Sequence, residues 1–211
     1  MSTDIDGAMR RTRGYWYVDG LTEIGAGGVF LAIGALFAVE VAAGDAGVLG
    51  GVSALGLPVV VLLGTWLAGR VVTAAKRRLT FPRTGYVAYP AASPARRSLT
   101  AVLGLAVALA VVVLLRLAGD WPALDRATPL LDGVAVAIFL MFMARSALVS
   151  RFYLLAALAV ALGAAAAAAT PDERAGTALF FAAMGLAFVL SGAAVLRRYL
   201  RATEAAADSP A

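Results

Sequence analysis

Residues 21–43 read LTEIGAGGVFLAIGALFAVEVAA, an apolar run interrupted only by Glu23 and Glu40. A hydrocarbon core roughly 30 Å thick is crossed by about 20 helical residues, so this run is long enough to span a membrane. Five further stretches have a similar length and character: about 48–70, 99–118, 129–149, 152–169 and 177–196. The sequence therefore predicts an all-α fold, a polytopic transmembrane bundle of six helices.

The composition agrees with this class. Hydrophobic residues make up 62% of the chain and charged residues 15%, whereas soluble domains carry about 25% charged residues. We divide the chain into an N-terminal segment 1–20, a transmembrane domain 21–196 with a basic loop 71–98, and a tail 197–211. No helix breaker follows Arg70 until after Arg78, so we expect the second helix to continue into this loop.

Threading six helices through a membrane sorts the cations to one side. That side carries Arg10, Arg11, Arg13, Arg70, Lys76, Arg77, Arg78, Arg83, Arg96, Arg97, Arg145, Arg151, Arg197, Arg198 and Arg201. The other side carries Asp45, Asp120, Asp125, Asp172 and Glu173 against only two cations, Arg126 and Arg174. Because Lys and Arg are enriched in cytoplasmic loops, both termini are predicted to be cytoplasmic. The excess of Arg over Lys and the alanine content are typical of a GC-rich prokaryotic genome, which indicates a prokaryotic plasma membrane.

The residue types restrict the chemistry. The chain contains no cysteine and no histidine, which removes thiol catalysis, the commonest general base and the commonest transition-metal ligand. A magnesium site would need several converging carboxylates, and no such cluster occurs on the basic side. We predict no enzyme activity, no catalytic residue, no metal and no cofactor.

The loop 71–98 is the segment most able to bind something. No acidic residue occurs between Asp45 and Asp120, and tight-turn residues and aromatic rings accompany the loop's cations. A short strand, turn and strand over residues 79–89 is one prediction for its structure. The candidate lipid or partner contacts are Lys76, Arg77, Arg78, Phe81, Arg83, Gly85 and Tyr86.

Several roles for this loop remain open. Its basic residues could serve only to orient the helices and contact anionic lipid headgroups, each contact worth on the order of 1 kcal/mol. They could form a specific site for a partner protein or lipid, or bind a phosphorylated substrate through Arg77, Arg78 and Arg83. The loop is too short and too close to the bilayer for a nucleic-acid-reading module.

Ionisable or helix-breaking residues within the spans suggest an alternative function, a small-solute or ion transporter. They are Glu40, Pro58, Arg116 and Asp132. Charges in hydrocarbon are costly and often mark a transport pathway, and Pro58 predicts a kink in the second helix. However, Glu40, Arg116 and Asp132 are expected near the outer interface, where side chains can reach water and where Glu40 and Arg116 could pair.

Three segments resemble a family of uncharacterised prokaryotic multi-pass membrane proteins. The residues that carry the likeness are Asp19-Gly20-Leu21 with Glu23-Ile24, and Lys76-Arg77-Arg78-Leu79-Thr80-Phe81-Pro82-Arg83-Thr84-Gly85-Tyr86-Val87, a basic T-x-P-R-x-G-Y-V loop. Arg151-Phe152-Tyr153 is assigned to the same pattern. The resemblance implies a specific role for the loop, but no activity.

Small residues predict which helices pack most closely. They recur in the first helix, from Gly25 to Gly34, and in the sixth, from Ala183 to Gly192, and they allow close backbone approach. Taken together, the sequence predicts a non-enzymatic membrane component whose basic cytoplasmic loop binds a partner protein or anionic lipid. The expected partners are the bilayer, anionic headgroups, and a membrane protein or a second copy of the chain; nucleic acid is not expected.

Overall fold

The computed structural model describes residues 17–44, 52–79 and 122–207, and all of the regular structure in these ranges is helical. The described residues form five helices: α2 Leu21–Ala43, α3 Val52–Leu79, α6 Pro122–Ala147, α7 Arg151–Ala169 and α8 Glu173–Ala207. All five are long and apolar enough to cross a membrane. The predicted helical membrane protein is thus confirmed at this level, whereas the helix predicted over 99–118 lies outside the described residues.

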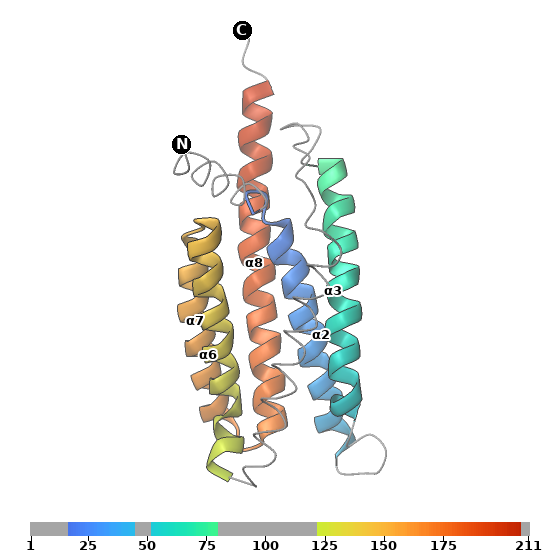
Figure 1. The fold of residues 1–211 in the computed structure, drawn as a ribbon, viewed down its shortest axis with the longest axis vertical. Helices are drawn as coiled ribbons and strands as arrows, with labels where there is room; N and C mark the ends of the chain where they lie inside the picture. The colour runs from blue at the N-terminus through green and yellow to red at the C-terminus, as the bar shows by residue number, and fades with distance from the viewer. Residues whose placement is uncertain (1–16, 45–51, 80–121, 208–211) are drawn as a thin grey trace, which may run out of the picture.

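The helices stand side by side with their long axes roughly parallel (Figure 1). Helix α8 is central, because it packs against α2, α6 and α7, while α3 packs on α2 and α7 packs on α6. The start of α2, the end of α3, the turn between α6 and α7 and the last part of α8 lie at one end. We call this the basic end, and the other the opposite end. The end of α3 thus lies at the basic end and the start of α6 at the opposite end.

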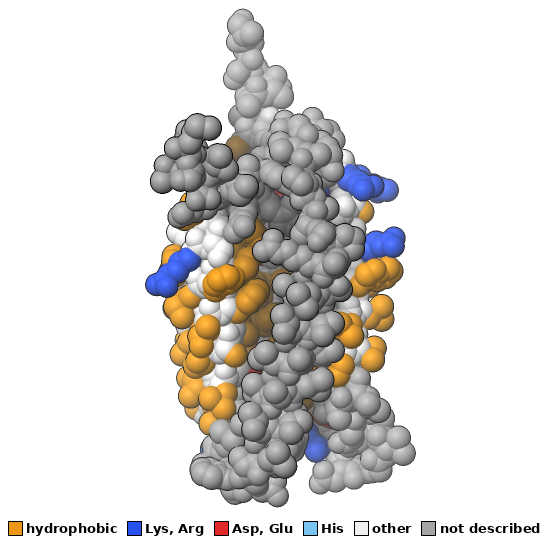
Figure 2. Space-filling model, in the orientation of Figure 1, with side chains coloured by type: hydrophobic (Ala, Val, Ile, Leu, Met, Phe, Trp, Pro, Cys, Tyr) orange, Lys and Arg blue, Asp and Glu red, His pale blue; other side chains and the backbone are white. Residues whose placement is uncertain are grey.

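The apolar side chains also fit a membrane-spanning bundle. Many large ones point outward, including Leu62 on α3, Phe142 on α6 and Leu154 on α7, which is 75% exposed. On the face seen in Figure 2, hydrophobic side chains lie on the left and right flanks, about halfway between the two ends of the molecule. Such a surface is unfavourable in water and suits hydrocarbon.

Glycines bring α2 and α8 into close antiparallel contact. Gly20 lies against Gly192 and Gly27 against Gly185, while Gly34 faces Ala178 and Ala182. A Cβ atom at Gly27 would lie 2.7 Å from the carbonyl oxygen of Gly185. The contacts recur every seven residues along both helices, the repeat that keeps one face turned toward a partner. The small residues were predicted to allow close approach to each of these helices, and the structure shows that the two helices pack on each other.

Gly20 is required for a second reason. Its φ of 70° lies in the left-handed region, which side-chain-bearing residues rarely adopt. A Cβ atom there would also lie 2.3 Å from the carbonyl oxygen of Gly192. This position starts α2 and presses its first turn onto α8, which brings Asp19 and Glu23 into the bundle.

Most helix boundaries differ from the prediction, and local chemistry explains two of the larger differences. Helix α8 begins at Glu173 rather than 177 because the Asp172 carboxylate accepts the Arg174 N–H at 3.1 Å, an N-terminal cap. Helix α6 begins at Pro122 rather than 129, since proline is well tolerated at the first helical position. Helix α8 also continues through residue 207, so part of the predicted tail is helical.

The second helix runs to Leu79, as its lack of breakers predicted, so residues 71–79 are helix and not loop. Residue 79 is also the only member of the predicted strand-turn-strand that the structure describes, and it is helical. The remaining residues of that prediction lie outside the described ranges.

Candidate functional site

Four charged side chains meet inside the basic end of the bundle. We call Asp19, Glu23, Lys76 and Arg151 the charge cluster. Asp19, Glu23 and Lys76 are each at most 2% exposed, and they come from the start of α2 and the end of α3. Charged residues of this kind are rarely so buried unless they are paired.

The first pair joins α3 to the residue before α2. The Lys76 ammonium lies 2.8 Å from Asp19 Oδ2 and donates a hydrogen bond to Oδ1 at 2.9 Å. Asp19 Oδ1 also accepts the backbone N–H of Leu21 at 3.2 Å, which satisfies a donor in the first turn of α2. One carboxylate therefore fixes the start of α2 and holds the end of α3 against it.

The second pair joins α2 to α7 and α8. Arg151 Nε donates to Glu23 Oε1 at 2.6 Å, and Ser191 Oγ donates to Glu23 Oε2 at 2.7 Å. Arg151 also donates to the carbonyl oxygen of Tyr17, and its side chain is 27% exposed. Glu23 is thus held by groups from two other helices, which cross-links the basic end.

Aromatic side chains extend the charge cluster toward the middle of the bundle. The rings of Tyr17 and Phe152 meet edge to face with centroids 5.5 Å apart, and the Arg151 guanidinium lies 5.5 Å from the centroid of the Phe152 ring. Burial raises the pKa of the Tyr17 phenol above its ordinary value. The Tyr17 hydroxyl consequently stays protonated at neutral pH.

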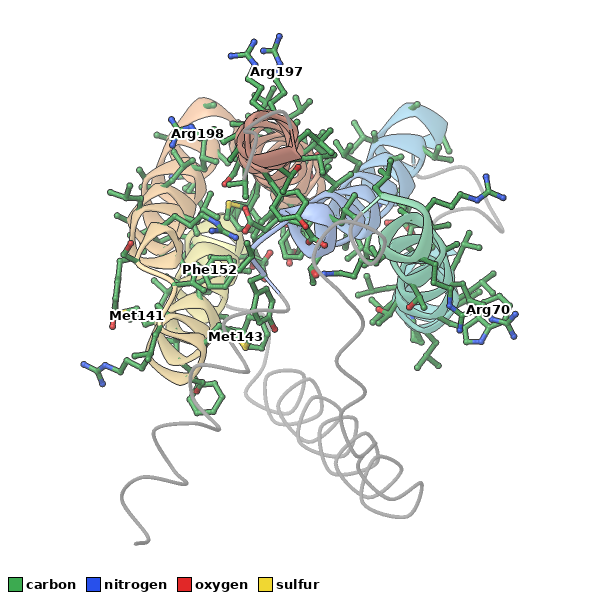
Figure 3. All side chains as sticks on the ribbon, turned by 90° about the horizontal axis from the view of Figure 1, so that it is seen from above. Arg70, Met141, Met143, Phe152, Arg197 and Arg198 are labelled. Carbon is green, nitrogen blue, oxygen red and sulfur yellow. The ribbon has the colours of Figure 1, made fainter. Side chains whose placement is uncertain are left out.

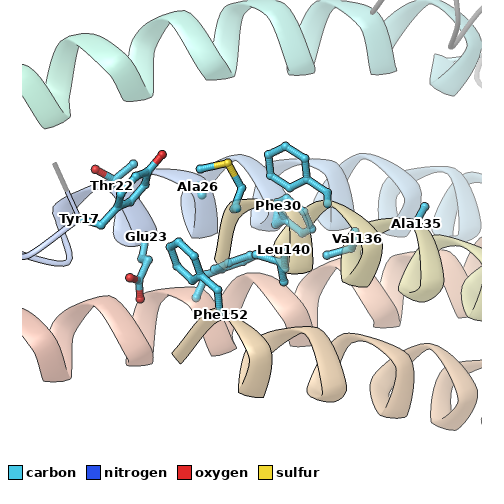
Figure 4. Close-up of a pocket in the computed structure, with 12 residues that line it drawn as sticks. Tyr17, Thr22, Glu23, Ala26, Phe30, Ala135, Val136, Leu140 and Phe152 are labelled. Atoms are coloured by element: carbon cyan, nitrogen blue, oxygen red, sulfur yellow. The ribbon is translucent and has the colours of Figure 1, made fainter. Parts of the chain in front are cut away.

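A cavity of about 500 Å³ adjoins the charge cluster. Figure 4 shows Tyr17, Thr22 and Glu23 grouped at one end of it and Phe30, Val136 and Ala135 farther along. The complete set of lining residues is Tyr17, Thr22, Glu23, Ala26, Phe30, Ala135, Val136, Phe139, Leu140, Met143, Phe152 and Phe188. Its volume lies in the range of small-molecule sites, about 300–1,000 Å³.

A second cavity, of about 330 Å³, lies at the turn between α6 and α7. Its lining is more polar and includes Tyr17, Ser150 and Arg151. Because Tyr17 lines both cavities and Arg151 lies over Phe152, the two cavities are neighbours at the basic end.

Among the side chains that the structure describes, the exposed charges at the basic end are arginines. Arg77 and Arg78 on α3, Arg145 on α6, and Arg197 and Arg198 on α8 are exposed. Seen from above, Arg70 and Arg197 point away from the bundle, while Phe152 points into it (Figure 3). The two acids with described side chains at this end, Asp19 and Glu23, are turned inward. The described part of the surface at this end is therefore cationic.

The predicted lipid or partner contacts are placed unequally. Arg77 and Arg78 are exposed in the last turn of α3, as a surface contact requires. Lys76 is buried against Asp19, because the helix turns it toward α2, so it is not presented to lipid or a partner. Phe81, Arg83, Gly85 and Tyr86 lie outside the described residues.

The predicted intramembrane residues do not share one site. Glu40 is 1% exposed, so its side chain does not reach water as expected for the outer interface. Asp132 lies well inside α6 and not at its start, because α6 begins at Pro122. Pro58 lies inside α3 and is exposed, and Arg116 lies outside the described residues. Glu40, Pro58 and Asp132 line neither of the cavities above.

Sequence reasoning missed the charge cluster. None of the sequence arguments paired these side chains, although the three segments of the family resemblance contain Asp19, Glu23, Lys76 and Arg151. In the part of the chain that the structure describes, no three acidic side chains gather closely enough to hold a metal ion. The charge cluster therefore contains two ion pairs that link helices, next to an apolar cavity.

Comparison with known proteins adds no relative. No protein-family model, no curated protein and no solved structure matches the chain.

Proposed function

We propose that this chain is a non-enzymatic component of a cell membrane, with six spans and both termini in the cytoplasm, whose basic face binds anionic lipid headgroups or an acidic partner protein. The observation that carries the proposal is the division of charge at the basic end. Two acids are buried in ion pairs, while Arg77, Arg78, Arg145, Arg197 and Arg198 are exposed.

The physical basis is electrostatic. Each Lys or Arg near an anionic membrane surface contributes about 1 kcal/mol, within a screening distance of about 8–10 Å. The positive-inside rule assigns the basic end to the cytoplasm. A negatively charged partner protein would meet the same field, and a second copy of this chain, being equally basic there, would be repelled from that face.

The test compares two double variants that remove equal charge. Arg77→Gln with Arg78→Gln removes two exposed cations from the basic end, and Arg126→Gln with Arg174→Gln removes two from the opposite end. After purification in mild detergent, mass spectrometry counts the anionic lipids and any protein retained. Two contacts of about 1 kcal/mol correspond to a roughly 30-fold weaker association.

We expect the basic-end variant alone to lose its anionic lipid or partner, and the loss to resemble that of the native chain at high salt. Equal retention by both variants and the native chain would contradict the proposal. Equal loss from both variants would mean that net charge matters and the basic face does not, which also contradicts it.

The transporter alternative draws no support from the cavities. The cavity beside the charge cluster is lined mainly by apolar side chains, and neither Pro58 nor Asp132 borders it. We therefore retain the binding function as the proposal.

A further inference from the structure

The cavity beside the charge cluster has the polarity of a site for an amphiphile. Its hydroxyl and carboxylate groups, from Tyr17, Thr22 and Glu23, lie at the basic end, and the remaining walls are aromatic or aliphatic. A molecule with a polar head and a hydrocarbon body would match this order in one orientation only.

The cavity is built between two helices that do not form one of the main pairings. Helices α2 and α6 each pack on α8, yet extensive packing between the described parts of α2 and α6 is absent. Phe139 and Ala135 of α6, which line the cavity, are themselves exposed, Phe139 at 61%. The cavity thus reaches the apolar outer surface of the bundle, which lipid chains would contact in a membrane.

Hydrocarbon alone would not select an occupant from a bilayer. Lipid tails are as apolar as the cavity walls, so moving a tail into the cavity gains little from the hydrophobic effect. Selection must come from the head group. Beside the cavity lies the partly exposed Arg151, which lines the second, more polar cavity.

We propose that the cavity holds one acyl chain of an anionic phospholipid from the leaflet at the basic end. The chain lies between α2 and α6 along Phe30, Phe139 and Met143. The phosphate lies in the second cavity near Arg151, where Tyr17 and Phe152 separate head from tail. The choice of an anionic lipid rests on the proposed function, whereas the site for a chain rests on the cavity alone.

The test uses lipids that label what they touch. The full chain is reconstituted into phosphatidylcholine vesicles that contain phosphatidylglycerol with a diazirine in the middle of one acyl chain. A parallel sample carries the diazirine on phosphatidylcholine. After irradiation, peptide mapping compares labelling of residues 135–143 of α6 with labelling of residues 59–67 of α3. The α3 segment carries Val59, Leu62 and Leu63, which are exposed, and it reports ordinary lipid contact.

We expect residues 135–143 to be labelled in excess of the α3 segment, and the excess to be larger with phosphatidylglycerol. Filling the cavity by Ala26→Phe should abolish the excess. Ala135→Phe fills it from the α6 side and gives the same test if the first variant does not fold. Ala157→Phe places the same bulk on an exposed position of α7 that lines neither cavity, and should leave the excess intact.

An excess that survives both filling variants, or no excess in the native chain, would overturn the site. Equal labelling by the two lipids would overturn its assignment to an anionic lipid. The Arg77 and Arg78 variant separates the two proposals. If it loses no lipid or partner while the excess persists, the proposed function fails and the chain site stands.

Discussion

Lys76→Met should destabilise the bundle more than any exposed cation-to-neutral change at the same end. The substitution leaves the Asp19 carboxylate, which is 1% exposed, without the ammonium that lies 2.8 Å from Oδ2. Breaking a buried pair by removing one partner costs about 3–5 kcal/mol, because an uncompensated charge stays buried. The hydrogen bond from the Leu21 N–H to Asp19 remains in the variant and offsets only part of this cost.

The magnitude is measured as a double-mutant cycle. Unfolding of the purified chain in detergent is followed for the native protein, Lys76→Met, Asp19→Asn and the double variant. The double variant buries no charge, because both members of the pair are neutral. Asn also keeps a side-chain oxygen that can accept the Leu21 N–H. We expect the double variant to recover most of the loss, with a coupling energy of about 2–3 kcal/mol, inside the range for residues in direct contact.

A charge swap sharpens the test. Asp19→Lys with Lys76→Asp restores opposite charges but places a group with no acceptor beside the Leu21 N–H. We therefore expect the swap to recover less than the neutral double variant. Arg77→Met, one position along α3 and exposed, is the matched control. If Lys76→Met unfolds like the control, or the cycle shows no coupling, the argument for a buried pair is refuted.

Two further predictions concern packing and topology. Gly27→Ala should destabilise the bundle by about 1–3 kcal/mol, since its Cβ would lie 2.7 Å from the carbonyl oxygen of Gly185. Gly28→Ala, which has open space around it, should be neutral or slightly stabilising. Equal unfolding of the two variants would contradict the close α2–α8 contact. The chain has no cysteine, so a single introduced cysteine is the only site for a membrane-impermeant maleimide. Applied to intact cells, the reagent should label Pro171→Cys at the opposite end, and it should label Leu148→Cys at the basic end only after permeabilisation. The reverse pattern would invert the proposed orientation.

The positions of the described spans could be predicted from the sequence, because the hydropathy of a segment depends only on the residues within it. The bounds of α2 agree with the prediction and those of α7 differ by one residue. The start of α8 was misplaced although its signal is local, since Asp172 is an N-terminal cap that the apolar pattern does not register. Pro122 likewise marks the start of α6.

The candidate site was less predictable. Arg77 and Arg78 were expected at the surface and are exposed there, because cations near the end of a span point toward water unless a partner holds them. Lys76 was grouped with them, since nothing in its neighbourhood distinguishes it. Only the rotation of α3 about its axis, set by packing on α2, turns Lys76 inward and its two neighbours outward.

By itself, then, the sequence determined that this chain is a helical membrane protein, and it predicted that most of its cations gather on one side. Both properties depend on composition and on the order of spans. The tertiary structure decided which charges remain available. Asp19 pairs with Lys76, 57 residues away in the sequence, and Glu23 pairs with Arg151, 128 residues away. The close α2–α8 contact and the position of the helix ends at the same end of the bundle bring these residues together. That geometry buries two acids, leaves a cationic face and places a cavity beside it, and no local pattern in the sequence contains it.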